Sequence, residues 1–305
     1  MPTDVRPTPF GAATTVVPID LPRTLGWYPH GRFDPTTRLD DRSFVRACWT
    51  PDGPGEVRLD WSGDRLRAAG WGPGADWAVQ SALAMTGADR GVTAMPDVHP
   101  LVTEAARRWQ GVRTGASGDL YSALLPTILE QRITSGEAKR QWAALCRELG
   151  EAAPGPHGLL LPPRPERLAG RPAWWFHPLG IEAKRARAVV EVGRIADRLW
   201  DWAQRPVDEL ADLLGRVRGI GPWTIGSVLG PVCGDDDAVA VGDYHFPNMV
   251  AFNLAGEARA DDARMLTLLE PFRGRRGRVI RLLSLAGRRA PAFGPRHRIL
   301  PMHRW

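Results

Sequence analysis

The chain has 305 residues, of which 43% are hydrophobic and 24% are charged. This is enough apolar material for more than one packed core. No apolar run approaches the roughly 18 to 20 residues that a membrane-spanning helix needs. The start of the chain carries no basic region followed by an apolar core, so we expect no secretion signal. The composition therefore excludes a helical membrane protein and predicts a soluble, cytoplasmic one.

Three cysteines, Cys48, Cys146 and Cys233, lie far apart in the sequence and form no ligand cluster. Their spacing argues against a disulfide framework, a zinc site and a four-cysteine iron–sulfur cluster. We therefore expect a protein of a reducing compartment without a cysteine-bound cofactor.

Lys and Arg together number 40 and Asp and Glu 34, which gives a net charge of +6. The excess lies late in the chain, because residues 271–305 contain ten arginines and no acidic residue. This asymmetry is expected of a protein that binds a polyanion such as nucleic acid. A GC-rich genome also enriches Arg, Ala, Gly and Pro, so composition alone leaves both explanations open.

The first 22 residues show little periodicity and predict a flexible arm. Residues 43–49, 56–61 and 65–71 alternate apolar and polar side chains and are separated by turns rich in Pro, Asp and Gly. This pattern predicts antiparallel strands joined by hairpins. Residues 75–85 have helical spacing and are expected to cover one face of the sheet. We predict an α+β domain over residues 23–98.

The remainder predicts an all-helical domain over residues 99–290, followed by a basic tail over 291–305. The proline-rich strip 153–172 predicts a loop. The expected helices, which share apolar residues at intervals of three and four, are 101–110, 119–131, 135–149, 182–203, 207–217, 224–232, 247–255, 260–270 and 277–286.

Between two of these helices the chain reads Val-Arg-Gly-Ile-Gly-Pro-Trp-Thr over residues 217–224. Two glycines around one apolar residue make a tight turn, which gathers backbone N–H groups at the start of the second helix. Unpaired donors and the helix dipole favour an anion there. The candidate phosphate-binding residues are Gly219, Ile220, Gly221 and Thr224. A Gly-x-Gly tripeptide by itself is more often a helix cap, but Pro222 beside Trp223 makes the hexapeptide more specific.

With these residues in view, the chain resembles the helix-hairpin-helix DNA glycosylases, and within them the branch called 3-methyladenine DNA glycosylase II. The resemblance rests on the hairpin, on Asp243 and on segments 129–134, 179–186 and 269–273, and it covers most of the chain. It implies a monomeric base-excision-repair enzyme of the bacterial nucleoid that binds damaged double-stranded DNA. It also implies a Na⁺ or K⁺ ion at the backbone of the two hairpin glycines, no required cofactor and no membrane contact.

The resemblance places the catalytic acid at Asp243. Cleavage of the N-glycosidic bond builds positive charge on the deoxyribose, so a nearby carboxylate stabilises the transition state more than the ground state. A structural alternative is that Asp243 caps the helix predicted at 247–255.

Lyase-competent relatives carry a lysine at the position of Trp223, where its amine attacks C1′. A tryptophan there implies simple hydrolysis of alkylated purines, and its ring suits a cationic base. We therefore assign Trp223, Ser227 and Tyr244 to the base pocket, with core packing of Trp223 as the alternative. Ser227 stands where this branch often has a further aromatic, which leaves room for other lesions. His245 flanks the acid and is more often structural.

Further DNA contacts are expected at Gln131 and Arg132. Arg132 stands where relatives fill the gap left by the extruded nucleotide; a cation there fills that gap or binds phosphate. The candidate phosphate contacts late in the chain are Arg273, Arg275, Arg276 and Arg278, for which a solvated face is the alternative. Two alternative functions remain open: a glycosylase for deaminated or oxidised bases, and a non-catalytic DNA-binding module.

Overall fold

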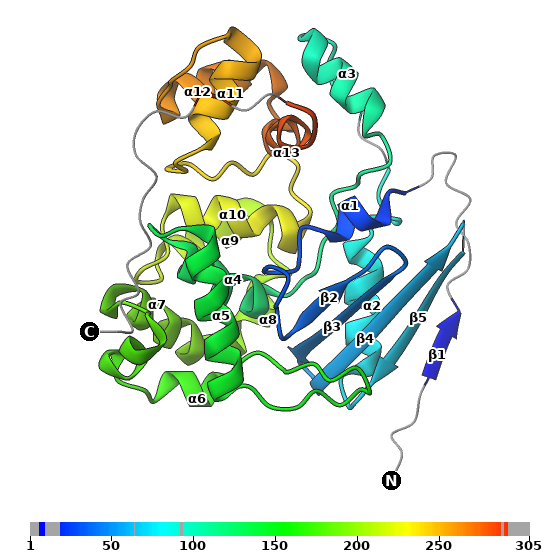
Figure 1. Ribbon diagram of the computed structural model, residues 1–305, viewed down its shortest axis with the longest axis vertical. Coiled ribbons are helices and arrows are strands. Elements are labelled where there is room, and N and C mark those ends of the chain that lie inside the picture. Colours follow the sequence, from blue (N-terminus) through cyan, green and yellow to red (C-terminus); the bar gives the residue numbers. More distant parts are fainter. Residues whose placement is uncertain (1–5, 10–18, 64, 92–93, 288–289, 292–305) are drawn as a thin grey trace.

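The computed structural model describes residues 6–9, 19–63, 65–91, 94–287 and 290–291. An antiparallel sheet occupies one side of the molecule and a body of helices the other (Figure 1). The predicted α+β class is confirmed. Of the helices described, none is long and apolar enough to cross a membrane.

The sheet has five strands in the order β1-β5-β4-β3-β2, and every neighbouring pair is antiparallel. The predicted hairpins are confirmed, and the helix α2 (Ala75–Met85) packs against β4 and β5. Side chains from both layers, among them Phe44, Leu59 and Met85, form a core without solvent exposure. The strands are β1 (Arg6–Pro9), β2 (Thr37–Leu39), β3 (Ser43–Thr50), β4 (Gly53–Ser62) and β5 (Arg65–Trp71).

The expected arm over residues 1–22 contains two regular elements. The strand β1 lies at the edge of the sheet, where its two prolines are tolerated because only one side of the strand pairs. The helix α1 (Leu21–Leu25) starts where the Asp20 carboxylate accepts a hydrogen bond from the Arg23 amide at 3.1 Å. Residues 1–5 and 10–18 lie outside the described part of the chain.

The helical body follows the predicted segments with three differences, one of which is the 3-10 helix η1 (Ala173–Leu179), where no helix is predicted. The segment 182–203 is divided at Ile195 into two helices, and the expected loop 153–172 contains a short helix that begins at Pro165, a residue favoured in the first helical turn. Residues 292–305 of the predicted tail lie outside the described residues. The helices are α3 (Pro100–Arg108), α4 (Leu120–Glu130), α5 (Ser135–Leu149), α6 (Pro165–Ala169), η1 (Ala173–Leu179), α7 (Ala183–Arg194), α8 (Ala196–Trp202), α9 (Val207–Gly215), α10 (Pro222–Cys233), α11 (Phe246–Ala255), α12 (Asp262–Leu269), η2 (Glu270–Phe272) and α13 (Arg276–Ala286).

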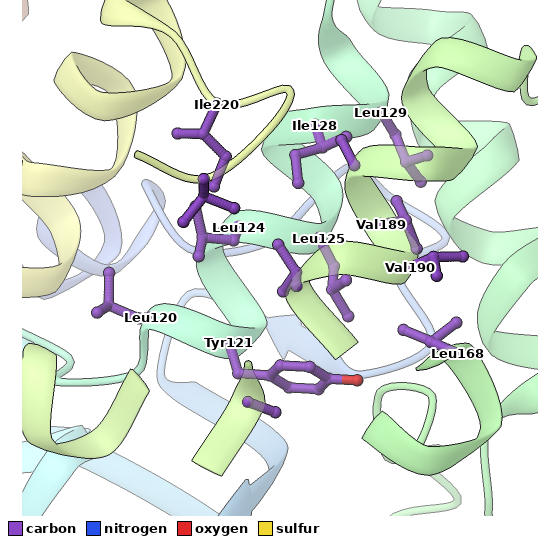
Figure 2. Close-up of a cluster of buried hydrophobic side chains, with 14 of the residues drawn as sticks. Leu120, Tyr121, Leu124, Leu125, Ile128, Leu129, Leu168, Val189, Val190 and Ile220 are labelled. Atoms are coloured by element: carbon purple, nitrogen blue, oxygen red, sulfur yellow. The ribbon is translucent and has the colours of Figure 1, made fainter. Parts of the chain in front are cut away.

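The helix α4 is the centre of this body. Leu124, Leu125 and Ile128 have no exposed surface, and they lie among side chains of α7 and of the turn between α9 and α10 (Figure 2). Burial of each such side chain stabilises the fold by about 1.5 to 3 kcal/mol. Because α4 also contacts α5 and α10, its C-terminal end is held beside that turn.

A separate core joins α3 to the last helices of the chain. It contains Val102 of α3 together with Val250, Met265 and Val279 of α11, α12 and α13. These helices form a second lobe beyond α10 (Figure 1).

Candidate active site

A cavity of about 510 Å³ lies where the sheet domain meets both helical lobes. Its wall includes Trp27 and Tyr28 after α1, Glu130 at the end of α4, and Trp223 and Asp243 around α10. Parts of the chain about 200 residues apart therefore build one site.

The glycine turn between α9 and α10 is the predicted hairpin. Gly219 has φ +94°, which side chains rarely adopt, and a Cβ there would lie 2.6 Å from the Cβ of Ala188 on α7. Gly221 differs, because its φ of −121° is ordinary and a Cβ would meet nothing within 4 Å. Ile220 is 5% exposed and packs beside α4 (Figure 2). The turn therefore packs against α7 at Gly219 and faces open space at Gly221.

Four backbone N–H groups of the hairpin donate to no acceptor within the described chain, namely those of Gly219, Gly221, Trp223 and Thr224. The amide of Ile220 is different, since it donates to the carbonyl of Val217 at 3.1 Å. The predicted phosphate contact of the Ile220 amide would compete with this hydrogen bond, so Ile220 is a weaker candidate than its two glycine neighbours. The free donors lie around the start of α10, where the helix dipole also favours an anion.

Gln131 of the α4 end holds the hairpin turn through hydrogen bonds to Gly219 and Thr224. The Nε2 atom of Gln131 donates to the Gly219 carbonyl and to the Thr224 hydroxyl, each at 3.0 Å. Thr224 as a whole is 1% exposed, so neither its hydroxyl nor its amide lies at the surface, and the structure does not support the predicted DNA contact at this residue. Gln131 connects α4 to the hairpin.

Arg132 follows directly and is exposed. Its φ is +58°, the only positive value at a non-glycine residue in the described chain. This conformation costs an ordinary residue about 1 to 2 kcal/mol, and it displays the Arg132 side chain on the surface beside the hairpin.

Asp243 lies between α10 and α11 with its carboxylate held by three donors. The indole N–H of Trp223 donates to Oδ2 at 3.0 Å, and the amides of His245 and Phe246 donate to Oδ1 at 2.7 and 2.9 Å. Asp243 thus accepts hydrogen bonds from the first amides of α11 and also lines the cavity, so its structural contact does not exclude the predicted catalytic role. Its carboxylate is pre-oriented, as electrostatic catalysis requires.

The predicted base pocket is only partly assembled. Trp223 and Ser227 line the cavity, and the Ser227 hydroxyl donates to the Trp223 carbonyl at 2.7 Å. Tyr244 does not line the cavity. Its side chain is 79% exposed and packs edge-on against the His245 ring, with 5.0 Å between the ring centres. The assignment of Tyr244 to the pocket is wrong: the turn that aims Asp243 inward directs the next residue outward.

Of the four late arginines, Arg276 and Arg278 are engaged inside the fold, whereas Arg273 is exposed. Arg276 forms an ion pair with Asp237, Arg273 pairs with Glu270 at 2.7 Å, and Arg275 is half-buried. Arg278 is 7% exposed, and its Nη2 donates to the Val112 carbonyl at 3.1 Å. The prediction of a surface phosphate contact at Arg278 is therefore wrong, because the guanidinium is used inside the fold.

Several cavity residues carry no signal in the sequence. Trp27 packs under the guanidinium of Arg281, whose carbon lies 4.1 Å from the ring centre. Arg281 also donates to the carbonyls of Thr24 and Arg113, and burial lowers its pKa to about 10. Trp27 belongs to the N-terminal part, so only tertiary contacts bring it to the cavity.

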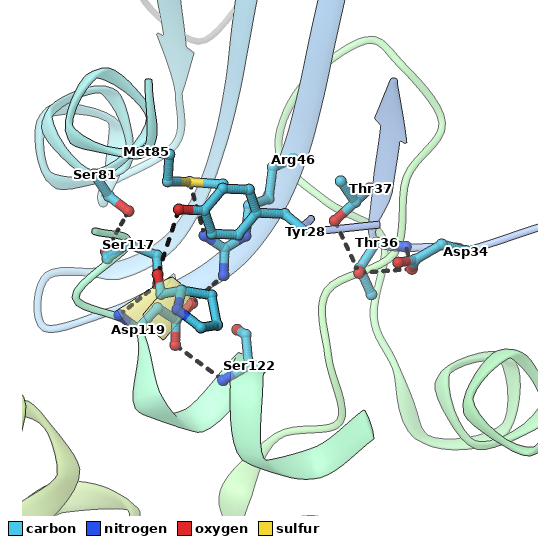
Figure 3. A network of polar contacts seen from close by, with 11 residues as sticks. Tyr28, Asp34, Thr36, Thr37, Arg46, Ser81, Met85, Ser117, Asp119 and Ser122 are labelled. Atoms are coloured by element: carbon cyan, nitrogen blue, oxygen red, sulfur yellow. Dashed lines mark hydrogen bonds and ion pairs between the residues drawn. The ribbon is translucent and has the colours of Figure 1, made fainter. Parts of the chain in front are cut away.

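A buried polar joint holds the sheet domain against the helical body (Figure 3). Arg46 of β3 forms an ion pair at 2.8 Å with Asp119, which caps α4. Nearby, the Tyr28 hydroxyl donates to the Pro231 carbonyl in α10 at 3.4 Å. Breaking one partner of such a buried pair costs about 3 to 5 kcal/mol. The joint keeps the N-terminal wall of the cavity in place.

The Na⁺ or K⁺ ion expected at the backbone of the two hairpin glycines stays a prediction, because a carbonyl oxygen that accepts one hydrogen bond keeps a second lone pair for a cation. The Gly219 carbonyl accepts from Gln131, and the Gly221 carbonyl accepts from the Ile225 amide at 3.0 Å. In the described chain no group of three His, Cys, Asp or Glu side chains is arranged to hold a metal. No step below depends on a metal ion.

Comparison of the whole chain with solved structures gives the fold. A 3-methyladenine DNA glycosylase from Archaeoglobus fulgidus aligns with a TM-score of 0.72 at 14% identity, over 92% of this chain and 98% of that one. The fold is that of the DNA glycosylases. By sequence the chain matches no family model and no curated protein.

Two further structures with the glycosylase fold were bound to DNA. MBOgg1 in complex with a low-affinity DNA ligand aligns with a TM-score of 0.63 at 15% identity, over 93% of this chain and 98% of that one. The Clostridium acetobutylicum 8-oxoguanine glycosylase/lyase, in complex with double-stranded DNA containing cytosine opposite 8-oxoguanine, gives 0.60 at 14% identity, over 87% and 90%. The likeness thus spans both the sheet domain and the helical body.

Proposed function

We propose that this protein is a monofunctional DNA glycosylase that hydrolyses the N-glycosidic bond of alkylated purines in double-stranded DNA. One observation carries the proposal: the oriented carboxylate of Asp243 stands at the wall of a cavity large enough to admit a nucleobase, beside a hairpin with free backbone donors. A DNA-binding module without catalysis could use that carboxylate at the start of α11, but it would have no use for its second oxygen at the wall of a cavity.

The hairpin is the proposed grip on DNA. The unpaired N–H groups of Gly219, Gly221 and Trp223 donate to the oxygens of one phosphate, which positions the duplex without reading its sequence. Rotating a nucleotide out of the stack costs a few kcal/mol, and less for a damaged base. The exposed Arg132 is suited to occupy the resulting gap.

The extruded base enters the cavity and brings its sugar to Asp243. As the bond between C1′ and the base lengthens, positive charge grows on the sugar, and the Asp243 carboxylate stabilises it. Trp223 and the two backbone amides hold that carboxylate, so it need not reorganise during the reaction. A water molecule then adds to C1′, which leaves an abasic site in an intact strand.

The absence of lyase chemistry is proposed from Trp223, which has no amine to form a Schiff base. Lys139 of α5 also lines the cavity. Borohydride reduction in the presence of abasic DNA is expected to give no covalent adduct; an adduct lost in Lys139→Ala would contradict a monofunctional enzyme.

Aromatic walls support alkylated purines as substrates. Trp27, Tyr28 and Trp223 border the cavity, and a ring face attracts a base made cationic by alkylation at a ring nitrogen. A polar wall favours a second candidate, a glycosylase for other damaged purines, because Ser227 and Glu130 also face the cavity.

The test is a panel of duplexes, each with one methylated, deaminated or oxidised purine. We expect release of the methylated purine and strand cleavage only after alkali. Binding of every duplex without release of any base would overturn the proposal in favour of a binding module.

A further inference from the structure

Glu130, the last residue of α4, lies in the same cavity wall as Asp243 and is half-buried. Within the described chain its carboxyl group makes no hydrogen bond and no ion pair. An unpaired carboxylate taken partly out of water is costly, and the negative end of a helix adds to that cost. Such a group in a cavity indicates a function rather than a structural contact.

The surroundings of Glu130 favour its neutral form. Burial raises its pKa, Lys139 opposes this, and the negative charge of Asp243 raises the pKa further. Glu130 thus keeps its proton to higher pH than an exposed glutamic acid. The charged or titratable groups on the elements around it are Lys139 on α5, Arg185 on α7, Asp243 after α10, and His30 and Arg46 in the sheet domain.

We propose that Glu130 is the acid that protonates the departing base, so that the substrates include damaged purines that are uncharged. This inference rests on the glycosylase function proposed above. The two carboxyl groups then have separate roles in the reaction, as paired carboxyl groups do in glycoside hydrolysis. Asp243, held by three donors, stabilises the sugar, and Glu130, without a partner, supplies the proton.

The proton balance is closed. The carboxyl group of Glu130 transfers its proton to a ring nitrogen of the purine while the bond between C1′ and the base breaks. The electron pair of that bond leaves with the base. Water adds to C1′ and gives one proton to the Asp243 carboxylate. That proton passes to solvent, and Glu130 takes up another through the cavity.

The proposal predicts that the importance of Glu130 depends on the charge of the lesion. A purine methylated at N7 is cationic and leaves as a neutral base without a proton, whereas hypoxanthine needs one. General acid catalysis contributes about 10² to 10⁴-fold. Glu130→Gln is therefore expected to slow hypoxanthine release by at least about 100-fold and to leave 7-methylguanine release within about threefold.

The experiment measures single-turnover release of both bases by the full-length wild type, Glu130→Gln, and Glu148→Gln as a matched control. Glu148 is exposed on α5 and lies outside the cavity wall. For the wild type, hypoxanthine release should fall as pH rises through the pKa of Glu130. In Glu130→Gln this decline should disappear.

Two outcomes would overturn the assignment. Equal loss on both bases would make Glu130 a structural or binding residue, and release of 7-methylguanine but not hypoxanthine by the wild type would exclude the neutral substrate while the proposed function stands. Release of neither base, nor of any other in the panel, would instead remove the glycosylase function itself.

Discussion

The hairpin and the arginine-rich segment 273–278 are both predicted from the sequence to bind DNA, and they differ in how many of their donors the fold already uses. The hairpin carries little charge of its own but leaves four backbone donors free. The arginine-rich segment is strongly basic, yet Arg276 and Arg278 are engaged by groups of the protein. By its unused donors the hairpin is therefore the stronger candidate for the proposed phosphate contact, although the arginine-rich segment carries more positive charge.

The difference has a physical cause. Backbone N–H groups at the start of a helix have no carbonyl one turn earlier to bind. A guanidinium on a long side chain can instead reach an aspartate or a carbonyl of its own fold, and the free energy of burial favours that pairing. Arg281 is the extreme case, because it donates to three carbonyls and packs on Trp27.

Removing the charge at the cavity should have the largest effect. Asp243→Asn is expected to slow base release by about 1,000-fold, equal to about 4 kcal/mol, because the developing sugar cation loses its carboxylate. Duplex affinity should change little. Asp212→Asn, the same change at an exposed position on α9, serves as control in single-turnover release and fluorescence anisotropy. Release at the wild-type rate would exclude Asp243 from catalysis.

The two hairpin glycines should respond differently. Gly219→Ala places a Cβ 2.6 Å from the Ala188 Cβ and imposes strain at φ +94°, so we expect a loss of about 2 kcal/mol in the free energy of unfolding. Gly221→Ala meets open space and should unfold within about 0.5 kcal/mol of wild type. Its methyl group should still weaken duplex binding. Urea denaturation and anisotropy measure both, and equal stability of the two variants would contradict the anchored turn.

Arg276→Ala should act on stability and not on DNA. It leaves Asp237 partly buried without its ion pair, and we expect a loss of about 1 to 2 kcal/mol in unfolding free energy. The salt dependence of duplex binding should match wild type, since a residue that contacts phosphate contributes about one unit of slope. A smaller slope in Arg276→Ala would show that the arginine-rich segment contacts DNA after all.

Glu130→Gln should make the protein slightly more stable at neutral pH. Burial raises the pKa of Glu130, so the folded chain holds this proton more tightly than the unfolded chain. Its contribution to stability is therefore largest in acid and falls as pH rises through the folded pKa. We expect a gain of about 1 kcal/mol in Glu130→Gln at pH 7, measured by thermal unfolding from pH 4 to 8. A loss of stability at pH 7 would indicate a structural partner for Glu130.

Local patterns in the sequence predicted much of this molecule. Alternation of apolar and polar side chains predicts three of the strands, and apolar residues at intervals of three and four predict most of the helices. The two glycines predict the hairpin. These features depend on neighbours within a few residues, so they can be predicted from a single sequence. The edge strand Arg6–Pro9 was missed for the same reason, because its prolines give no local strand signal and only pairing with β5 makes it a strand.

Tertiary structure alone decided which side chains remain available. Nothing local distinguishes Arg276, which pairs with an aspartate about 40 positions away, from an arginine free to meet DNA. Nor does any local pattern bring Trp27 and Glu130 into one cavity with Asp243. Burial, pairing and cavity shape arise from contacts between distant segments, and they determine whether a donor or a carboxyl group is left for a substrate.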